Sequence, residues 1–169
     1  GKLPERVDFR RHPQHGDGFL QIENQGSIGS CQSNSLTDCA EAAYMLNSGK
    51  IIQFSRMYSY TDSQIKDGLR GDKGSTLQGG TKSALEGLCP EQFAPYPKKY
   101  PGYSYITQQM RGYARKYRLQ SHTALKSADE VLQYLGSGIG LVQIGIAWGN
   151  EMSKPDAKGC IRQFVGKGG

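Results

Sequence analysis

The sequence lacks a long hydrophobic run. Its longest apolar stretch reaches from Ile139 to Trp148, and Gln143 interrupts it. A helix that crosses a bilayer needs about 20 predominantly apolar residues, so this stretch excludes a transmembrane span. Internal repeats and low-complexity tracts are also missing. The 169 residues are enough for one ordinary globular domain, which is what we expect.

Cysteine is scarce, and no two cysteines have the Cys-x-x-Cys spacing of a metal site. Cys31 and Cys39 lie on one predicted helix, about 12 Å apart, because each residue rises about 1.5 Å. Disulfide bonds need α-carbons closer than about 7 Å, so these two cannot pair. This excludes a disulfide scaffold and leaves the compartment open, with a secreted or virion-associated protein favoured over a cytoplasmic one.

Histidine is scarcer still, with three residues. His12 and His15 lie near Asp17 in a segment that could bind a metal, but we interpret it as a solvent-exposed loop. His122 is interpreted as a surface or packing residue. We therefore expect no metal site and no cofactor.

Acidic residues are missing from residues 98–118, which carry six lysines and arginines. The charge of this segment alone equals the formal net charge of the whole chain, +6. Five tyrosines are interleaved with the basic residues, a composition typical of nucleic-acid surfaces. No nucleic-acid motif accompanies it, so we interpret the segment as a solvated basic face with tyrosines packed partly inward. Nucleic acid is not an expected partner.

The hydrophobic pattern predicts several helices followed by a strand. Residues 1–30 are expected to be extended chain and loop, residues 141–148 a buried strand, and residues 160–165 allow a second strand. This order of elements predicts an α+β fold. Helices are expected over 31–47, from the N-cap Ser55 to about 66, after Ser75 or Thr76, over 107–117, and from the capping box at Ser127 to Gly136.

Small and polar residues surround Cys31 in a pattern that suits a nucleophile. At the first turn of a helix, unpaired N–H groups and the positive end of the dipole favour a thiolate. Gly29 and Ser30 leave the thiol open to a substrate carbonyl. The backbone N–H of Cys31 and the side-chain amide of Gln25 could donate hydrogen bonds to the resulting oxyanion. The alternative is a buried structural cysteine.

This segment, Gln-Gly-Ser-Ile-Gly-Ser-Cys from Gln25 to Cys31, resembles the nucleophile motif of the papain family of cysteine peptidases. Residues 3–10 resemble the mature start of that family, and residues 89–97 and 141–146 resemble later stretches. The resemblance implies hydrolysis of peptide bonds in peptide or protein substrates. It implies catalytic roles for Cys31 and Gln25 and substrate binding by Gly29, Ser30 and the glycine pair Gly79 and Gly80.

The sequence departs from the family pattern at several points. Ile28 stands where the family has a half-cystine, and Gln32 where it has tryptophan. The family's catalytic histidine and asparagine follow the cysteine by roughly 130–150 residues. The resemblance therefore places them beyond residue 169, after the glycine-rich run 166–169.

The resemblance implies a papain-like fold. Residues 1–118 would form a helical half with a central helix starting at Cys31 and an N-terminal arm crossing to the other half. Residues 119–169 would begin an incomplete β-barrel half. Three explanations of the missing histidine stay open: the natural chain continues, a second chain completes a split enzyme, or this is a non-catalytic structural or binding module of a larger assembly such as a viral or phage particle.

Overall fold

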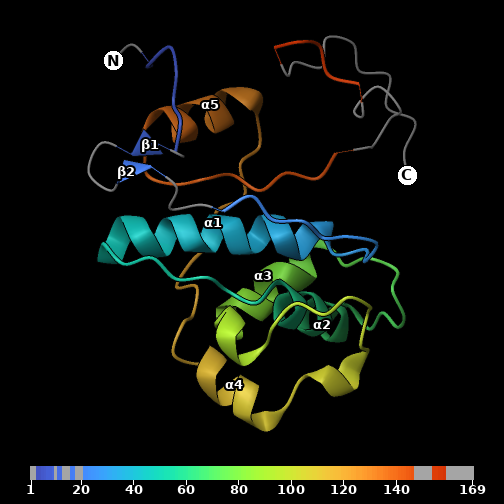
Figure 1. Cartoon of the computed structure of the whole chain (residues 1–169). Helices are drawn as coiled ribbons and strands as arrows, with labels where there is room; N and C mark the ends of the chain where they lie inside the picture. The colour runs from blue at the N-terminus through green and yellow to red at the C-terminus, as the bar shows by residue number, and fades with distance from the viewer. Residues whose placement is uncertain (1–2, 10, 13–15, 18–20, 147–153, 159–169) are drawn as a thin grey trace.

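Helices make up most of the regular structure. The computed structural model describes residues 3–9, 11–12, 16–17, 21–146 and 154–158. Figure 1 shows the elements in chain order: β1 (Arg11–His12), β2 (Gly16–Asp17), α1 (Cys31–Ser48), α2 (Arg56–Asp67), α3 (Leu77–Glu86), the 3-10 turns η1 (Glu91–Phe93) and η2 (Tyr103–Tyr105), α4 (Gln108–Ala114) and α5 (Ala128–Gly136).

The helices begin and end at residues that suit those positions. The hydroxyls of Ser55, Thr76 and Ser127 each accept a hydrogen bond from the backbone N–H three residues later, at the starts of α2, α3 and α5. Gly49 and Gly68 end α1 and α2 in the left-handed conformation. The predicted helices are thus confirmed, and only α4 is clearly shorter, ending three residues before its predicted end.

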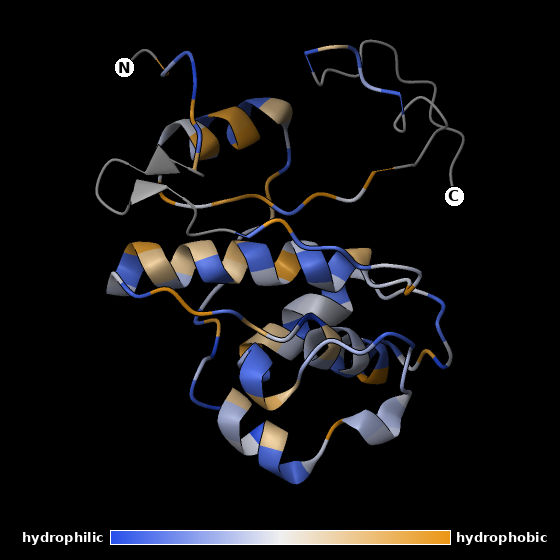
Figure 2. Ribbon diagram, in the orientation of Figure 1, coloured by the Kyte–Doolittle hydropathy of each residue, from blue (hydrophilic) through white to orange (hydrophobic). Residues whose placement is uncertain are grey.

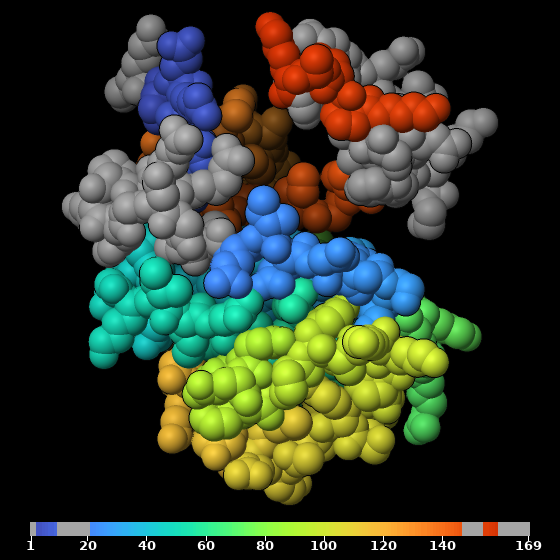
Figure 3. Space-filling model, viewed as in Figure 1, coloured from blue at the N-terminus to red at the C-terminus, as the bar shows by residue number. Residues whose placement is uncertain are grey.

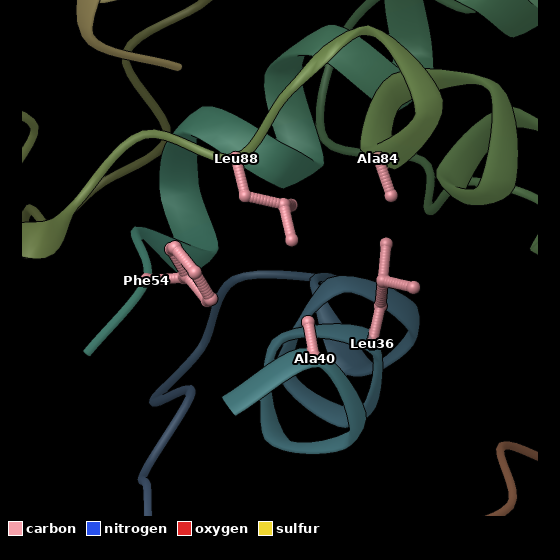
Figure 4. Close-up of a cluster of buried hydrophobic side chains, with 5 residues drawn as sticks. All are labelled: Leu36, Ala40, Phe54, Ala84 and Leu88. Atoms are coloured by element: carbon pink, nitrogen blue, oxygen red, sulfur yellow. The ribbon is translucent and has the colours of Figure 1, made fainter. Parts of the chain in front are cut away.

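Helix α1 lies in the middle of the molecule, between α2, α3 and α4 on one side and α5 on the other (Figure 1). One of its faces contributes to a cluster of five buried side chains shown in Figure 4: Leu36, Ala40, Phe54, Ala84 and Leu88. Its other face contributes Ala42 and Met45, which cluster with Phe9 of the N-terminal segment. Because two of its faces are buried, α1 packs against the cluster that includes α3 on one side and against the N-terminal segment on the other.

The layer beyond α1 contains the N-terminal segment, α5 and residues 139–146. Figure 2 shows many hydrophobic positions in this layer, including those along α5. A groove of about 590 Å³ lies between residues 3–9 and α5, and the Leu3 side chain lies close to the α-carbon of Gly136. Among the described helices, none is long and apolar enough to cross a membrane.

The strand expected at 141–148 is wrong over its described part. Residues 141–146 form no strand, and Ile144 and Ile146 are 62% and 52% exposed rather than buried. A strand needs backbone partners along its edge, and the only ladder in the described ranges joins β1 to β2. Residues 147–148 and the second expected strand at 160–165 lie outside the described residues. The expected division after residue 118 stays a prediction.

Candidate active site

Cys31 is the first residue of α1, and its side chain is exposed. Ser30 precedes it and is fully buried; its hydroxyl bonds to the Tyr96 hydroxyl and accepts from Asn34 Nδ2 at 3.0 Å. No acceptor within the described residues binds the backbone N–H of Cys31, as is usual in a first helical turn. The thiol therefore stands open at the positive end of an 18-residue helix.

A tight turn brings Gln25 back to the start of α1. Gly26 adopts a φ of +60°, and the Ile28 N–H donates to the Gln25 carbonyl at 3.3 Å. The carbonyl oxygen of Ile28 accepts from Gln25 Nε2 at 2.9 Å and from the Ser30 N–H at 2.8 Å. Figure 3 shows segment 21–30, in light blue, on the surface of the molecule. The Gln25 amide is thus fastened at the same helix end as Cys31.

Ile28 anchors this segment through apolar contacts instead of a disulfide. It is 2% exposed and clusters with Met57 and Tyr60 of α2. The cysteines in the described part of the chain, Cys31, Cys39 and Cys89, are all free. Burial of the Ile28 side chain therefore holds this segment in place at a position where the motif that it resembles has a half-cystine.

The loop that lies beside Gly29 is residues 71–75, which the sequence alone predicts only as a connection between helices. The Gly29 N–H donates to Asp72 Oδ1 at 2.9 Å, and the Tyr60 hydroxyl donates to the same oxygen at 2.7 Å. The Gly74 N–H in turn donates to the Tyr60 hydroxyl at 3.0 Å. A side chain at Gly29 would crowd Asp72, because a β-carbon there would lie 3.2 Å from Oδ1. The glycine-rich spacing of this loop was the signal that could have revealed it.

Gly79 and Gly80 have different surroundings from those that the sequence suggested. Both are buried in the first turn of α3. A β-carbon at Gly79 would overlap the Asp67 carboxylate, and one at Gly80 would overlap the Gln32 side chain. These glycines therefore permit close packing of α3 rather than lining open space, which explains two residues of poor helix propensity in one turn.

Residues 143–146 approach the start of α1 from another side. Gln143 Nε2 donates to the Gln32 carbonyl at 2.6 Å and to Ser35 Oγ at 2.7 Å. Nearby, a β-carbon built on Gly145 would lie 3.6 Å from Leu77 Cδ1. Leu77 is 42% exposed. The turn that carries Cys31 is thus bordered by exposed apolar surface from two distant segments.

Arg56 of α2 connects the segment that carries Gln25 to the first turns of α1. Its Nη1 lies 2.9 Å from the Glu23 carboxylate. The same nitrogen donates to the Asn24 carbonyl and to Asn34 Oδ1, each at 3.4 Å. The guanidinium also stacks over the Tyr96 ring, 4.2 Å from its centroid. Because Asn34 and Tyr96 both hold the serine before Cys31, Arg56 connects the arm that carries Gln25 to the helix start.

Several carboxyl groups lie around Arg56, and their burial opposes ionisation. Burial raises the pKa of Glu41, which is 8% exposed, to about 8. Burial, followed by the negative charge of Glu23, raises the pKa of Asp38 to about 6. The pKa of Glu91 is also raised, mainly by burial. Native protein therefore binds protons that the unfolded chain has released near neutral pH.

We expect the free energy of unfolding to fall as the pH rises from about 4 towards 8. An acid whose pKa is raised in the native state binds more protons there than in the unfolded chain throughout this window, so stability is greatest below the unfolded pKa and is lost above it. Each such group contributes at most about 1.4 kcal/mol per pH unit. Glu41→Gln keeps an acceptor for the Phe54 N–H and should flatten the fall.

Thermal unfolding across this pH range measures the effect. The exposed Glu5→Gln change is the matched control and should leave the profile unchanged. A Glu41→Gln profile as steep as that of the unaltered protein would contradict the assignment.

No histidine with a described side chain lies in the segments around Cys31. His122 is exposed in the connection between α4 and α5, and the side chains of His12 and His15 lie outside the described part. Within the described ranges, no three His, Cys, Asp or Glu residues form a group that could hold a metal ion.

Comparison with known sequences identifies the family. Residues 3–154 match the family described as papain family cysteine protease. Cathepsin F of Drosophila melanogaster is 36% identical over 103 residues, which are 59% of this chain and 15% of that protein. Procathepsin L of Mus musculus is 30% identical over 100 residues, covering 58% of this chain and 28% of that protein. The part of the chain that aligns thus covers less than a third of the length of each of these curated relatives.

Solved structures show the same fold. Xylellain, a cysteine protease from Xylella fastidiosa, aligns with a TM-score of 0.68 at 22% identity, covering 81% of this chain and 55% of that chain. The family match extends over most of the sequence, and the long central helix begins at the cysteine of the nucleophile motif. The chain therefore belongs to the papain family of cysteine proteases.

Proposed function

We propose that the whole protein hydrolyses peptide bonds through a thioester on Cys31. The observation that carries this proposal is an exposed thiol at the start of α1 with the Gln25 amide fastened at the same helix end. Membership of a protease family supports the same conclusion. The family match and the exposed thiol at the start of α1 favour the enzyme over a non-catalytic module.

In the proposed reaction, the Cys31 thiolate attacks the carbonyl carbon of the peptide bond, and the C=O electron pair moves onto oxygen. The Cys31 N–H and Gln25 Nε2 donate hydrogen bonds to this oxyanion. The intermediate collapses to a thioester and expels the amine, which takes the proton that a histidine received from the thiol. Water that the same histidine deprotonates then hydrolyses the thioester and restores the thiol.

We place this histidine, and the asparagine that orients it, beyond residue 169, at the spacing usual in the family. Residues 119–169 would then begin a β-rich half that the following residues or a second chain complete. The position of α5 and residues 140–146 across α1 from α2 supports a second half on that side (Figure 1). The intact mass of the protein from its natural source separates the two cases.

We infer that the substrate lies between two segments that border the first turn of α1. Gly29 and the loop 71–75, which are joined by the hydrogen bond from the Gly29 N–H to the Asp72 carboxylate, form one border. Leu77 and residues 143–146 form the other, which suits an apolar substrate side chain. This assigns the cleft wall to the loop 71–75 instead of Gly79 and Gly80. Ser30, being buried, positions Cys31 from beneath.

Gln25→Ala should lower kcat for a fluorogenic peptide amide by about 10²–10³-fold, because it removes one of two oxyanion donors. KM should change far less, since the donor acts mainly on the transition state. Steady-state kinetics of the whole protein measure both constants. The exposed Gln92→Ala is the control. An unchanged kcat in folded Gln25→Ala would remove this residue from the oxyanion site.

A further inference from the structure

A single buried side chain, that of Gln64 in the last turn of α2, binds the loop 71–75 at two points. Gln64 Nε2 donates to the Gly71 carbonyl at 2.8 Å and to the Gly74 carbonyl at 2.9 Å, so both amide hydrogens are used by this loop. Gly71 and Gly74 have left-handed backbones, with φ angles of +78° and +82°. The Gln64 amide therefore fixes the two turns on either side of Asp72.

Two tyrosines determine which way the Gln64 amide points. The Tyr100 hydroxyl donates to Gln64 Oε1, which leaves Nε2 facing the loop. The Tyr60 hydroxyl lies 3.1 Å from Nε2, accepts from the Gly74 N–H at 3.0 Å and donates to Asp72 Oδ1 at 2.7 Å. Both backbone groups of Gly74 are thus bound by α2 side chains. A flipped amide would place Oε1 against two carbonyl oxygens, which cannot donate to it, so the network favours one arrangement.

The loop has no other strong means of keeping its conformation. Residues 71–75 contain no apolar side chain that could anchor them, and neither they nor residues 25–30 contain a cysteine that could join the two segments. The Gly29 N–H donates to Asp72 Oδ1, the same oxygen that accepts from Tyr60. Exposed segments with few apolar contacts open easily unless hydrogen bonds hold them. The position of this loop beside Gly29 therefore depends on the network of α2.

We propose that Gln64 is a positioning residue of the proposed cleft, whose amide holds the loop 71–75 in the conformation that binds a peptide substrate. The inference rests on the proposed peptidase function, in which this loop and Gly29 form one border of the cleft. A wall that is already in its binding conformation lowers the entropy cost of binding a substrate. Gln64 acts through the loop and is itself buried.

The nucleophile is held by a different set of contacts. The hydrogen bonds of the Gln64 side chain run to the loop and to two tyrosines, whereas Ser30, which precedes Cys31, is bound by Tyr96 and Asn34. Loss of the Gln64 amide should therefore weaken substrate binding and leave the chemical step on the thiol nearly unchanged.

Gln64→Glu tests the proposal with almost no change of side-chain shape. A carboxylate has no hydrogen to donate, so the Gly71 and Gly74 carbonyls lose their partner and the loop should leave its conformation. In steady-state hydrolysis of a fluorogenic peptide amide by the whole protein, KM should rise at least about 10-fold while kcat stays within about 3-fold.

Alkylation of Cys31 gives a readout that needs no turnover. A peptidyl chloromethyl ketone has to occupy the cleft before it reacts, so its second-order rate constant should fall at least about 10-fold in Gln64→Glu. Iodoacetamide needs only the thiolate, and its rate constant should change less than about 2-fold. Mass spectrometry of the modified protein measures both rates.

Tyr100→Phe and Tyr103→Phe are a matched pair that keeps the test decisive should Gln64→Glu fail to fold. Both tyrosines are half-buried, and both hydroxyls donate to Gln64: that of Tyr100 to the side-chain Oε1, and that of Tyr103 to the backbone carbonyl at 3.1 Å. Each variant loses one hydrogen bond, but only Tyr100→Phe frees the amide. Tyr100→Phe should raise KM by about 3-fold or more, and Tyr103→Phe by less than about 2-fold.

An unchanged KM in folded Gln64→Glu, or equal KM values in the two tyrosine variants, would overturn the proposal while leaving the peptidase function in place. Equal slowing of both alkylating reagents would also overturn it, because the effect of Gln64 would then lie on the thiol. A complete lack of peptide hydrolysis by the unaltered whole protein would refute the proposed function, and this inference with it.

Discussion

Replacing Cys31 with alanine should reduce kcat for peptide hydrolysis by the whole protein at least about 10⁴-fold, the usual loss when a covalent nucleophile is removed. The proposed thioester forms on its sulfur, and no other described cysteine offers an exposed thiol at a helix start. Side-chain truncation at an exposed position should leave the fold intact, which circular dichroism can verify. Hydrolysis of a fluorogenic peptide amide measures the loss.

Cys39 provides the matched control for this prediction. Burial raises the pKa of the Cys39 and Cys89 thiols to about 11, so neither forms a thiolate readily near pH 6. Cys39→Ala should therefore keep activity within about 2-fold. Substoichiometric iodoacetamide should modify Cys31 first, as mass spectrometry of peptides can show. Activity retained by Cys31→Ala, or equal labelling of Cys31 and Cys39, would refute the nucleophile assignment.

Gly87→Ala should destabilise the protein by about 3–5 kcal/mol, the largest effect we expect away from Cys31. Gly87 ends α3 with a φ of +145° and a ψ of 154°, a conformation that residues with a β-carbon rarely adopt. A β-carbon there would also overlap the Ala114 carbonyl, which is rigid backbone at the end of α4. The unfolding temperature should fall by roughly 10 °C or more.

Gly112 is the matched control, because it lies in α4 and a β-carbon added there would meet no atom within 4 Å. Its φ is not in the left-handed region, so Gly112→Ala should stabilise the protein by about 0.5–1 kcal/mol through the higher helix propensity of alanine. Thermal unfolding compares the two variants directly. A Gly87→Ala protein as stable as the unaltered one would contradict this prediction, because it would mean that the end of α4 moves away from Gly87 at little cost in free energy.

Local patterns predicted the helices and the pair of residues proposed to stabilise the oxyanion. The caps at Ser55 and Ser127 act within three residues, so their signal is present in any short window of sequence. Gln25 and Cys31 are six residues apart, and a single turn at Gly26 is enough to bring them to one helix end. Interactions of such short range need no knowledge of the rest of the fold.

Tertiary packing decided the remaining neighbours of Cys31. The loop 71–75 reaches Gly29 through a hydrogen bond that spans 43 residues, and Gln143 reaches Gln32 across 111 residues. Residues 141–146, the described part of the strand predicted at 141–148, are instead tied to α1 by the Gln143 side chain. Sequence periodicity could not distinguish these outcomes, because an apolar run looks alike whether its partner is a strand or a helix.

The family, the nucleophile motif and the positions of the helices, apart from the end of α4, were therefore predicted by the sequence alone, because they depend on residue type and on spacing within a few turns of chain. The surroundings of that motif were determined only by the tertiary structure. Gly79 and Gly80 illustrate the difference: a glycine pair signals a close approach, but only the packed helices show that Asp67 and Gln32 are what approaches. Contacts between distant segments depend on how whole faces pack, which no local pattern contains.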